Sequence, residues 1–450
     1  MNGPAVRAYD TVLKSSGRAG HAVVVECGLP WRFVFWEKAQ YVGCVDLGRG
    51  VWFTPEWCEV NSPNDEECYE PIMDKRLLYS SVEILERGPA RARVKWSYSL
   101  ADMRYRVFHG DSRAEEIYTI YPDGIALREV TLWPGSLDNH GGNPNFWQVQ
   151  EWILLNESGT TPRLELADDG PFSVSDGNGK TVVVEWPVPD HASPLCEQIT
   201  DIENWDSYIG LIRLKKGPSP FTIVPNSQAL FPYARCTACG GDHPHMNVFA
   251  REDSDPTFLH WPATEREDFI GWCRAGDEVG TVATHTSFMN CNFAMRTSDD
   301  DFIPTPFPGT SWYVLVGATD RQDSAGELNN LAGSYRSPGT VDIVRDKGEY
   351  GDPKRGRVIY EGYDYSIKAY GIRQHGNEDR VIMRLHPDVP VPHPALRIIG
   401  WHTAPYSVRV EVDGRQIADD RYALQISEND LVVWLADSVD HTTQIGLYAE

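Results

Sequence analysis

The sequence predicts an all-β protein in which a large antiparallel sandwich or supersandwich is followed by a smaller β-sandwich. Short runs rich in Val and aromatic residues recur along the chain, and Gly, Pro, Asn and Asp separate them about every 8 to 12 residues. Few stretches favour a helix, and no fixed-period repeat indicates a propeller or a solenoid. Together these observations favour stacked antiparallel sheets.

The first strands are expected between residues 21 and 53, where HAVVVECGLP, WRFVFWEKAQYVGCV and GRGVWFTP alternate β-rich runs with turn residues. The clearest hairpin is expected over residues 117 to 133. There the tripeptide Pro122-Asp123-Gly124 separates two alternating segments, which is a strong signal for a tight turn. Strands should continue at 146–155 and over 164–186, where DGNGK indicates another turn.

Two short stretches favour helix, residues 263–269 and residues 326–335. In the second, Leu328 and Leu331 would share one helical face. A single core seldom serves 450 residues, so we expect two domains. The predicted divisions are residues 1–336 for the large domain, 337–356 for a Gly- and Pro-rich linker or long loop, and 357–450 for the C-terminal sandwich, with Asp413-Gly414 as a hairpin turn.

The formal net charge of −24 argues against nucleic acid as a partner, because phosphate binding needs a basic stripe. No run of about 18 apolar residues is present, so no membrane span is expected. The nine cysteines follow no disulfide framework and are expected as reduced thiols. We therefore expect a cytoplasmic protein, or a periplasmic or secreted one if a leader has been removed, and an oligomer is compatible with the sequence.

A divalent metal site is one interpretation of CTACGGDHPHMN. Cys236 and Cys239 could supply half of a tetrahedral zinc site, with His243 and His245 close behind. Zinc or calcium is the expected ion, and no organic cofactor motif is present. The alternative is a pair of buried thiols in a hairpin with two loop histidines.

Two further histidines are candidates for proton transfer. His260 and His285 each stand among polar residues at a strand end, in LHWP and THTS. Elimination from a uronate requires a base, an acid and a group that neutralises the carboxylate. Tyr118 is a candidate acid. It and Tyr121 should lie on opposite faces of one strand, because their spacing is odd. The alternatives are satisfied core or surface histidines and a packed core tyrosine.

Candidate substrate-binding residues surround these groups in the sequence. They are aromatic, cationic or hydrogen-bonding side chains, namely His140, Trp147, Glu151, Arg251, Trp261 and Arg266. Glycoside hydrolysis would instead use two carboxylates. Glu151, on an expected strand, and the acidic residues of 265–268 offer such a pair.

Several segments in order resemble a family of bacterial all-β proteins associated with polysaccharide breakdown. They are YEPIMDKRLLYSSVEILERGPARARVKW, EIYTIYPDGIALRE, residues 148–155, HWPATERED, ATHTSF, LVGATD with LNNLAGSYRSPG, GYDYSIKAY and DLVVWL. The resemblance implies a galactose-mutarotase-like supersandwich followed by a smaller β domain, and CTACGGDHPH lies outside it. Polysaccharide lyases with related sheets look similar in using His and Tyr on a concave face, which implies roles for His260, His285 and Tyr118.

This reasoning predicts an enzyme that cleaves or dehydrates an acidic, uronate-containing oligosaccharide or polysaccharide by β-elimination. His285 or His260 would be the base. Two alternatives stay open, a glycoside hydrolase with paired carboxylates and a non-catalytic carbohydrate-binding protein. The fold alone does not select among them, because one fold hosts many reactions.

Overall fold

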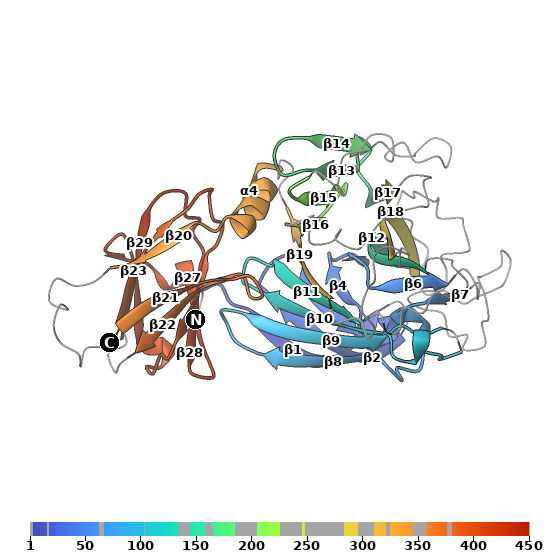
Figure 1. Cartoon of the computed structure of the whole chain (residues 1–450), viewed down its shortest axis with the longest axis horizontal. Coiled ribbons are helices and arrows are strands. Elements are labelled where there is room, and N and C mark those ends of the chain that lie inside the picture. Colours follow the sequence, from blue (N-terminus) through green and yellow to red (C-terminus); the bar gives the residue numbers. More distant parts are fainter. Residues whose placement is uncertain are drawn as a thin grey trace, which may run out of the picture.

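β-sheets make up most of the molecule, as the computed structural model shows (Figure 1). The structure describes residues 3–15, 18–62, 67–102, 104–133, 135, 145–157, 165–184, 205–225, 245–247, 283–295, 310–320, 325–344, 357–375 and 380–449. The predicted all-β class is confirmed. No helix in these ranges is long and apolar enough to cross a membrane.

The first sheet joins strands from the beginning and the middle of the chain. In the described ranges it has ten strands, and the main path runs β1 (Arg7–Ser15), β2 (Arg18–Glu26), β3 (Arg32–Trp36), β4 (Gly43–Asp46), β5 (Val51–Thr54), β12 (Asn145–Glu157), β18 (Ala283–Met295) and β17 (His245–Asn247). Off this path, β6 (Glu59–Ser62) pairs with β12 and β7 (Glu67–Tyr69). The first five strands follow one another as simple antiparallel neighbours.

The second sheet faces the first. Across the described residues its order is β14 (Thr181–Val184), β13 (Phe172–Ser175), β15 (Tyr208–Ile212), β16 (Ser219–Val224), β19 (Thr310–Thr319), β11 (Ala126–Trp133), β10 (Arg113–Ile120), β9 (Ala92–Ser99) and β8 (Ser81–Glu86). The predicted hairpin is confirmed, since β10 and β11 pair from Arg113 with Trp133 to Ile120 with Ala126. DGNGK likewise connects β13 with β14.

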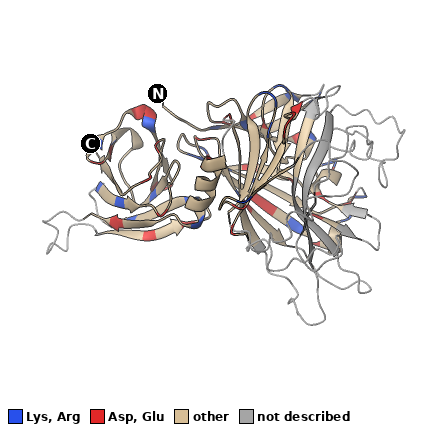
Figure 2. Cartoon of the chain, turned by 90° about the horizontal axis from the view of Figure 1, so that it is seen from above, with Lys and Arg blue, Asp and Glu red and all other residues tan. Residues whose placement is uncertain are grey.

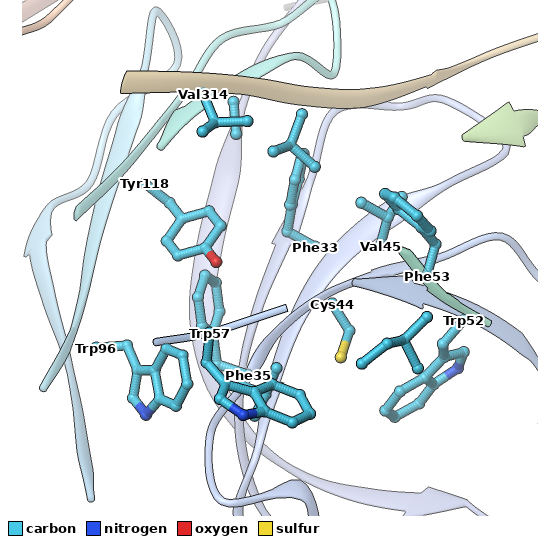
Figure 3. Close-up of a cluster of buried hydrophobic side chains, with 14 of the residues drawn as sticks. Phe33, Phe35, Cys44, Val45, Trp52, Phe53, Trp57, Trp96, Tyr118 and Val314 are labelled. Atoms are coloured by element: carbon cyan, nitrogen blue, oxygen red, sulfur yellow. The ribbon is translucent and has the colours of Figure 1, made fainter. Parts of the chain in front are cut away.

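The main core fills the space between the two sheets (Figure 3). The rings of Phe35 in β3 and Tyr118 in β10 meet edge to face with centroids 5.0 Å apart. The contact between Phe35 and Tyr118 shows that the odd-numbered residues of β3 point toward the second sheet. Two glycines let the sheets approach closely, because a Cβ on Gly43 would collide with Tyr118 and a Cβ on Gly210 would collide with Trp152.

A single α-helix in the described ranges, α4 (Ala325–Arg336), covers part of the other face of the second sheet. Its buried Leu328 and Leu331 pack with Leu127, Phe221 and Ile223. This confirms the helix predicted from the leucine spacing. The remaining helical turns are short 3₁₀ segments, η1 (Glu37–Ala39), η2 (Pro71–Met73), η3 (Phe108–Gly110), η6 (Pro405–Ser407) and η7 (Asp419–Arg421).

The C-terminal region is a sandwich of two sheets with its own core. One sheet contains β20 (Thr340–Ile343), β23 (Arg380–His386), β29 (Thr443–Ala449), β25 (Val408–Val412) and β26 (Arg415–Gln416). The other contains β21 (Arg357–Asp364), β22 (Ala369–His375), β24 (Ala395–Ile399), β28 (Asp430–Leu435) and β27 (Tyr422–Ser427). β22 and β24 pair in parallel, and the other pairs are antiparallel. The turn at Asp413-Gly414 connects β25 and β26 as predicted.

One part of the predicted linker is a strand. Residues Thr340–Ile343 form β20 and pair with Met383 to His386 of β23, so they belong to the C-terminal sandwich. The Gly- and Pro-rich composition of this segment suggested a loop, but the alternation of Val341 and Ile343 is completed by a partner strand some forty residues later. Residues 345–356 of the predicted linker lie outside the described ranges.

The two bodies lie side by side (Figure 2), and buried residues of both form one cluster at their junction. The side-chain oxygen of Gln425 in β27 accepts hydrogen bonds from the backbone N–H groups of Ala90, at 3.0 Å, and Arg91, at 2.8 Å. On the same side, the Tyr121 hydroxyl donates to the carbonyl of Ile367. Tyr118 faces the core between the large sheets and Tyr121 faces this junction, as their odd spacing predicted.

Candidate functional site

A continuous row of paired residues crosses the first sheet and ends at a predicted catalytic position. Each member is directly opposite the next in the strand register, in the order Glu26, Arg32, Asp46, Trp52, Leu155 and His285. We call these six positions the outer row. Residues directly opposite each other in a ladder share a face of the sheet, and alternate residues along a strand change face. Arg32 is three positions before Phe35, so the row from Glu26 to Leu155 lies on the face turned away from the second sheet. Trp52 and Leu155 in that row are nevertheless buried, at 7% and 3% exposure.

The near end of the outer row opens into a pocket of about 320 Å³. It forms where the turn between β2 and β3 approaches the turn between β4 and β5. We call it the rim pocket, and its lining residues are Glu26, Gly28, Leu29, Pro30, Trp31, Arg32, Asp46 and Gly48. Gly28 and Gly48 both have positive φ, and a Cβ at either position would meet no atom within 4 Å. The two turns thus leave open space between them.

The charged groups of the rim pocket hold one another in place. Arg32 Nε lies 2.9 Å from Asp46 Oδ2, and Arg32 Nη1 lies 3.7 Å from Glu26 Oε1. Asp46 Oδ1 also accepts the backbone N–H of Gly48 at 2.9 Å, which fixes the β4–β5 turn. The side chains of Arg32 and Glu26 are 35% and 39% exposed. The pocket therefore presents ordered but solvent-accessible donors and acceptors.

Tyr9 supports the acidic side of the rim pocket. Its hydroxyl donates a hydrogen bond of 2.8 Å to Glu26 Oε1. Burial raises the pKa of Tyr9, and the hydrogen bond and charge of Glu26 add to the shift. The phenol therefore stays protonated at neutral pH and remains a donor to the Glu26 carboxylate.

The apolar wall of the rim pocket is anchored in the second sheet. The indole N–H of Trp31 donates to the carbonyl of Gly124 at 3.1 Å, in the turn of the hairpin β10–β11. Leu29 is 36% exposed, and a Cβ on Gly124 would collide with it and with Trp31. The glycine predicted for the tight turn thus also allows the pocket wall to pack closely.

Four predicted site residues lie on three adjacent strands, β12, β18 and β17, at the other end of the sheet. Trp147 pairs with Phe293, Glu151 with Asn290, and His285 with Leu155. His245 of β17 pairs with Asn292. Two register shifts interrupt β12 between Gln148 and Ile153. Such bulges locally bend a strand and are frequent beside active sites.

The separations along these strands place the four residues at different distances from the rim pocket. Asn290, the partner of Glu151, is five positions from His285 along β18, or about 17 Å at 3.3 Å per residue. Trp147 and His245 lie farther from His285. His245 pairs with Asn292, and Trp147 pairs with Phe293, the next residue of β18. His285 is therefore at the end nearer the rim pocket, and Trp147 and His245 are at the opposite end.

The other predicted site residues lie outside the described ranges. They are His140, Arg251, His260, Trp261 and Arg266 and, in the proposed metal set, Cys236, Cys239 and His243. Their roles stay predictions. The described cysteines Cys27, Cys44 and Cys58 are free and buried.

Tyr118 occupies a position that does not fit its predicted role as proton donor. Its side chain is 1% exposed in the core, where its hydroxyl donates to Glu116 Oε2 at 2.9 Å. Burial raises the pKa of Tyr118 well above its usual value. A phenol sealed between two sheets cannot reach a departing sugar oxygen.

The partner of Tyr118 belongs to a buried ionic cluster that sequence reasoning missed. Glu116 and Arg128 are both 0% exposed and form a bidentate pair, with Nε to Oε2 at 2.7 Å and Nη2 to Oε1 at 2.6 Å. The hydroxyl of Tyr98 donates to Glu116 Oε1 at 3.0 Å. We call Glu116, Arg128, Tyr98 and Tyr118 the interior cluster. The sequence did hold a signal for this cluster, because Glu116 and Arg128 are charged residues at inward-facing positions of the predicted hairpin.

Comparisons with known proteins do not identify a family for this chain. The sequence matches no known family model, and no curated protein matches it. Among solved structures, a copper-containing benzylamine oxidase from Hansenula polymorpha is similar over 66% of this chain and 59% of that chain, with 11% sequence identity and a TM-score of 0.27. At that score the likeness carries no inference about fold or function.

Proposed function

We propose that this protein is a carbohydrate-active enzyme that cleaves or dehydrates a uronate-containing oligosaccharide or polysaccharide by β-elimination. Two observations support this proposal. His260 and His285 each stand among polar residues in the sequence, and the backbone at His285 pairs with Leu155 in the sheet that also carries the rim pocket. The proposal includes a galactose-mutarotase-like supersandwich as the architecture of the two large sheets.

In the proposed reaction, His285 or His260 removes the proton at C5 of the uronate. The electron pair of the broken C–H bond forms the C4–C5 double bond, and the C4–O bond breaks. The departing oxygen takes a proton from water or from the second histidine. A neutral imidazole suits the first step because its ordinary pKa lies near neutrality. Tyr118 is left out of this scheme because its hydroxyl is held in the interior cluster.

A cation must also neutralise the uronate carboxylate, since this charge opposes loss of the C5 proton. Arg251, Arg266 or a divalent metal held by Cys236, Cys239, His243 and His245 are the candidates from the sequence. Arg32 is too distant for this task. It is four inter-strand steps of about 4.8 Å from His285, or about 19 Å in all.

The test is a screen of acidic glycans with ultraviolet absorbance as the readout, since the unsaturated product absorbs and the substrate does not. Substitution His285→Ala should lower turnover by about 100-fold or more if the imidazole transfers the proton. His386→Ala is the matched control, because His386 lies on β23 of the C-terminal sandwich. Equal turnover of His285→Ala, His260→Ala and the control would contradict the assignment of either histidine as base.

Hydrolysis is the main alternative and has a different product. A hydrolase using Glu151 would release reducing ends without the chromophore, and Glu151→Gln would abolish that release. A non-catalytic binding protein would give neither product. Metal analysis of the same preparation, repeated on Cys236→Ser, tests the metal prediction separately from activity.

A further inference from the structure

We propose that two neighbouring loops, one before β8 and one after β9, form a binding surface for the carboxylate groups of an acidic glycan. The first loop comprises residues 74–80, and the second comprises residue 102 with residues 104–106. We call them the paired loops. The choice of a uronate-bearing glycan rests on the proposed function, but the surface does not depend on where the reacting ring lies. Three observations carry the proposal: the construction of the loops, their charge and the contact between them.

Buried aspartates hold both loops in shape. Asp74 in the first loop is 0% exposed, and its carboxylate accepts hydrogen bonds from the backbone N–H groups of residues 78–80 at 2.7 to 3.0 Å. Asp102 in the second loop is 1% exposed and accepts from the backbone N–H groups of Arg104 and Arg106, each at 2.9 Å. Both carboxylates therefore bind the backbone of their own loop and are turned away from solvent.

Each loop also turns at a residue with left-handed backbone. Leu77 has a φ of 53° and Tyr105 a φ of 62°. Each donates its N–H to the carbonyl of the buried aspartate three positions earlier, at 3.1 and 2.9 Å. An arginine precedes the left-handed residue in both loops, Arg76 in the first and Arg104 in the second. Such backbone is uncommon outside glycine and gathers at binding sites, and here it gives two arginines the same place on two similar turns.

The paired loops carry a local positive charge on an acidic protein. Their four cationic side chains are Lys75, Arg76, Arg104 and Arg106. With the two aspartates, the formal charge of the loops is +2 within a chain of −24. The three arginines are exposed, and the side chain of Arg106 remains 50% exposed although its Nε donates to Asp102 Oδ2 at 2.6 Å. An anion bound here meets cations at the surface and carboxylates only below it.

The two loops touch each other, which places Arg76 beside the second loop. The Tyr79 hydroxyl donates to the carbonyl of Tyr105 at 2.8 Å. The guanidinium of Arg76 lies over the Tyr105 ring, with its Cζ atom 5.2 Å from the ring centroid. Such stacking engages the flat face of a guanidinium, whereas its N–H donors point outward in the plane of the group. Arg76 is thereby held next to the backbone of Arg104, the residue before Tyr105.

These features suit a carboxylate on a sugar chain. A planar guanidinium binds a carboxylate through two parallel hydrogen bonds, so neighbouring arginines can hold uronates of one glycan. Leu78 is 57% exposed, and the partly exposed Tyr79 and Tyr105 lie in the same loops, so apolar surface is available to the faces of sugar rings. Nucleic acid fits less well, because its phosphates recur about every 3.4 Å along a strand and the net negative charge of the chain repels them.

Binding of intact acidic glycans tests the paired loops separately from catalysis. Hexasaccharides of galacturonate, of mannuronate and of hyaluronate are each titrated by calorimetry against the unsubstituted protein and against His260→Ala/His285→Ala, which should leave them uncleaved. At least one should bind, and raising the salt concentration from about 50 mM to about 500 mM should weaken it at least tenfold. A neutral glucose hexasaccharide should bind at least tenfold more weakly than that acidic ligand.

Removal of two guanidinium groups should weaken the acidic ligand. Arg76→Gln/Arg104→Gln should lower its affinity about tenfold, because two exposed ion pairs with the ligand are lost. Arg380→Gln/Arg384→Gln is the matched control, since it changes the net charge equally and Arg380 is an exposed arginine on β23 whose Cζ lies 5.5 Å from the Tyr448 ring centroid. Thermal melting checks the folding of both variants. If the loop variant is unstable, Arg76→Gln and Arg104→Gln alone replace it, each with about a threefold loss.

Four results would overturn the proposal: no binding of any acidic hexasaccharide, equal affinity of the loop variant and the control, a glucose hexasaccharide bound as tightly as the acidic ones, or a six-nucleotide DNA strand bound more tightly than all of them. The surface and the proposed function fail differently. An acidic hexasaccharide bound through the paired loops without any elimination product removes the proposed function and keeps the surface. Elimination with unchanged binding by the loop variant removes the surface and keeps the function.

Discussion

The interior cluster and the rim pocket each join an arginine to carboxylates among the described residues of the first two sheets, and their surroundings give them different tasks. In the interior cluster, Arg128 and Glu116 are fully buried, and the hydroxyls of Tyr98 and Tyr118 donate further hydrogen bonds to Glu116. In the rim pocket, Arg32 lies between Asp46 and Glu26 with about a third of its side chain exposed. The same chemical groups therefore stabilise the fold in one place and remain accessible to a ligand in the other.

The largest expected effect comes from removing the arginine of each cluster in turn. Arg128→Met leaves the Glu116 carboxylate buried without its counter-charge and should lower the free energy of unfolding by about 3 to 5 kcal/mol. Arg32→Met should cost only about 1 kcal/mol, because Arg32 and Glu26 are more than a third exposed and the largely buried Asp46 keeps its hydrogen bond from the Gly48 backbone. Urea denaturation of the two variants provides the comparison. Equal losses would show that burial does not separate the two clusters.

Loss of a buried hydrogen bond between uncharged groups should lower the free energy of unfolding by an intermediate amount. Gln425→Ala removes the acceptor of two backbone N–H groups, those of Ala90 and Arg91, at the junction of the two bodies. Leaving buried donors unpaired should cost about 1 to 3 kcal/mol. Calorimetry measures this loss, and Gln416→Ala on the exposed strand β26 is the control. A loss as small as that of the control would mean that water replaces Gln425 at the junction.

Removal of one hydroxyl should have a smaller effect still. Tyr118→Phe deletes the hydrogen bond to Glu116 and leaves the pair with Arg128 intact, so it should cost about 1 kcal/mol of stability. Turnover per folded molecule should stay within twofold of the unsubstituted protein. A loss of turnover of 100-fold or more at unchanged stability would restore Tyr118 as a catalytic acid.

The smallest effect is a pH dependence at Glu129 on the other face of the second sheet. Burial raises the pKa of Glu129 and the charge of Asp364 adds to the rise, while Arg93 and a hydrogen bond from Tyr313 oppose it. Because the folded pKa lies above the unfolded pKa, ionised Glu129 lowers stability at neutral pH, and this cost disappears as the pH falls through the folded pKa. Glu129→Gln should therefore raise Tm slightly at pH 7 and have less effect in acid. A larger gain in acid than at pH 7 would contradict the sign.

Local patterns in the sequence predicted the elements that depend on neighbours in the chain. Pro122-Asp123-Gly124 specifies its hairpin because the turn and both strands are contiguous, and the spacing of Leu328 and Leu331 identifies α4 in the same way. The strand at Thr340–Ile343 was missed because its partner β23 is remote in sequence.

The outer row could not be predicted because it depends on which distant strands become neighbours. Trp52 pairs with Leu155, and Leu155 pairs with His285, across separations of about 100 and 130 residues. No local signal encodes those pairings. The interior cluster has the same origin in part, since Arg128 also donates to the carbonyl of Glu56, a contact that no pattern near Arg128 indicates.

The central claim is that this protein eliminates across a uronate with a histidine as the base, and the ultraviolet absorbance of an acidic glycan incubated with the protein tests it most directly. The account predicts absorbance that grows with the unsubstituted protein and grows about 100-fold more slowly with His285→Ala or His260→Ala. Reducing ends released without that absorbance, or equal rates for both variants and His386→Ala, would contradict the claim.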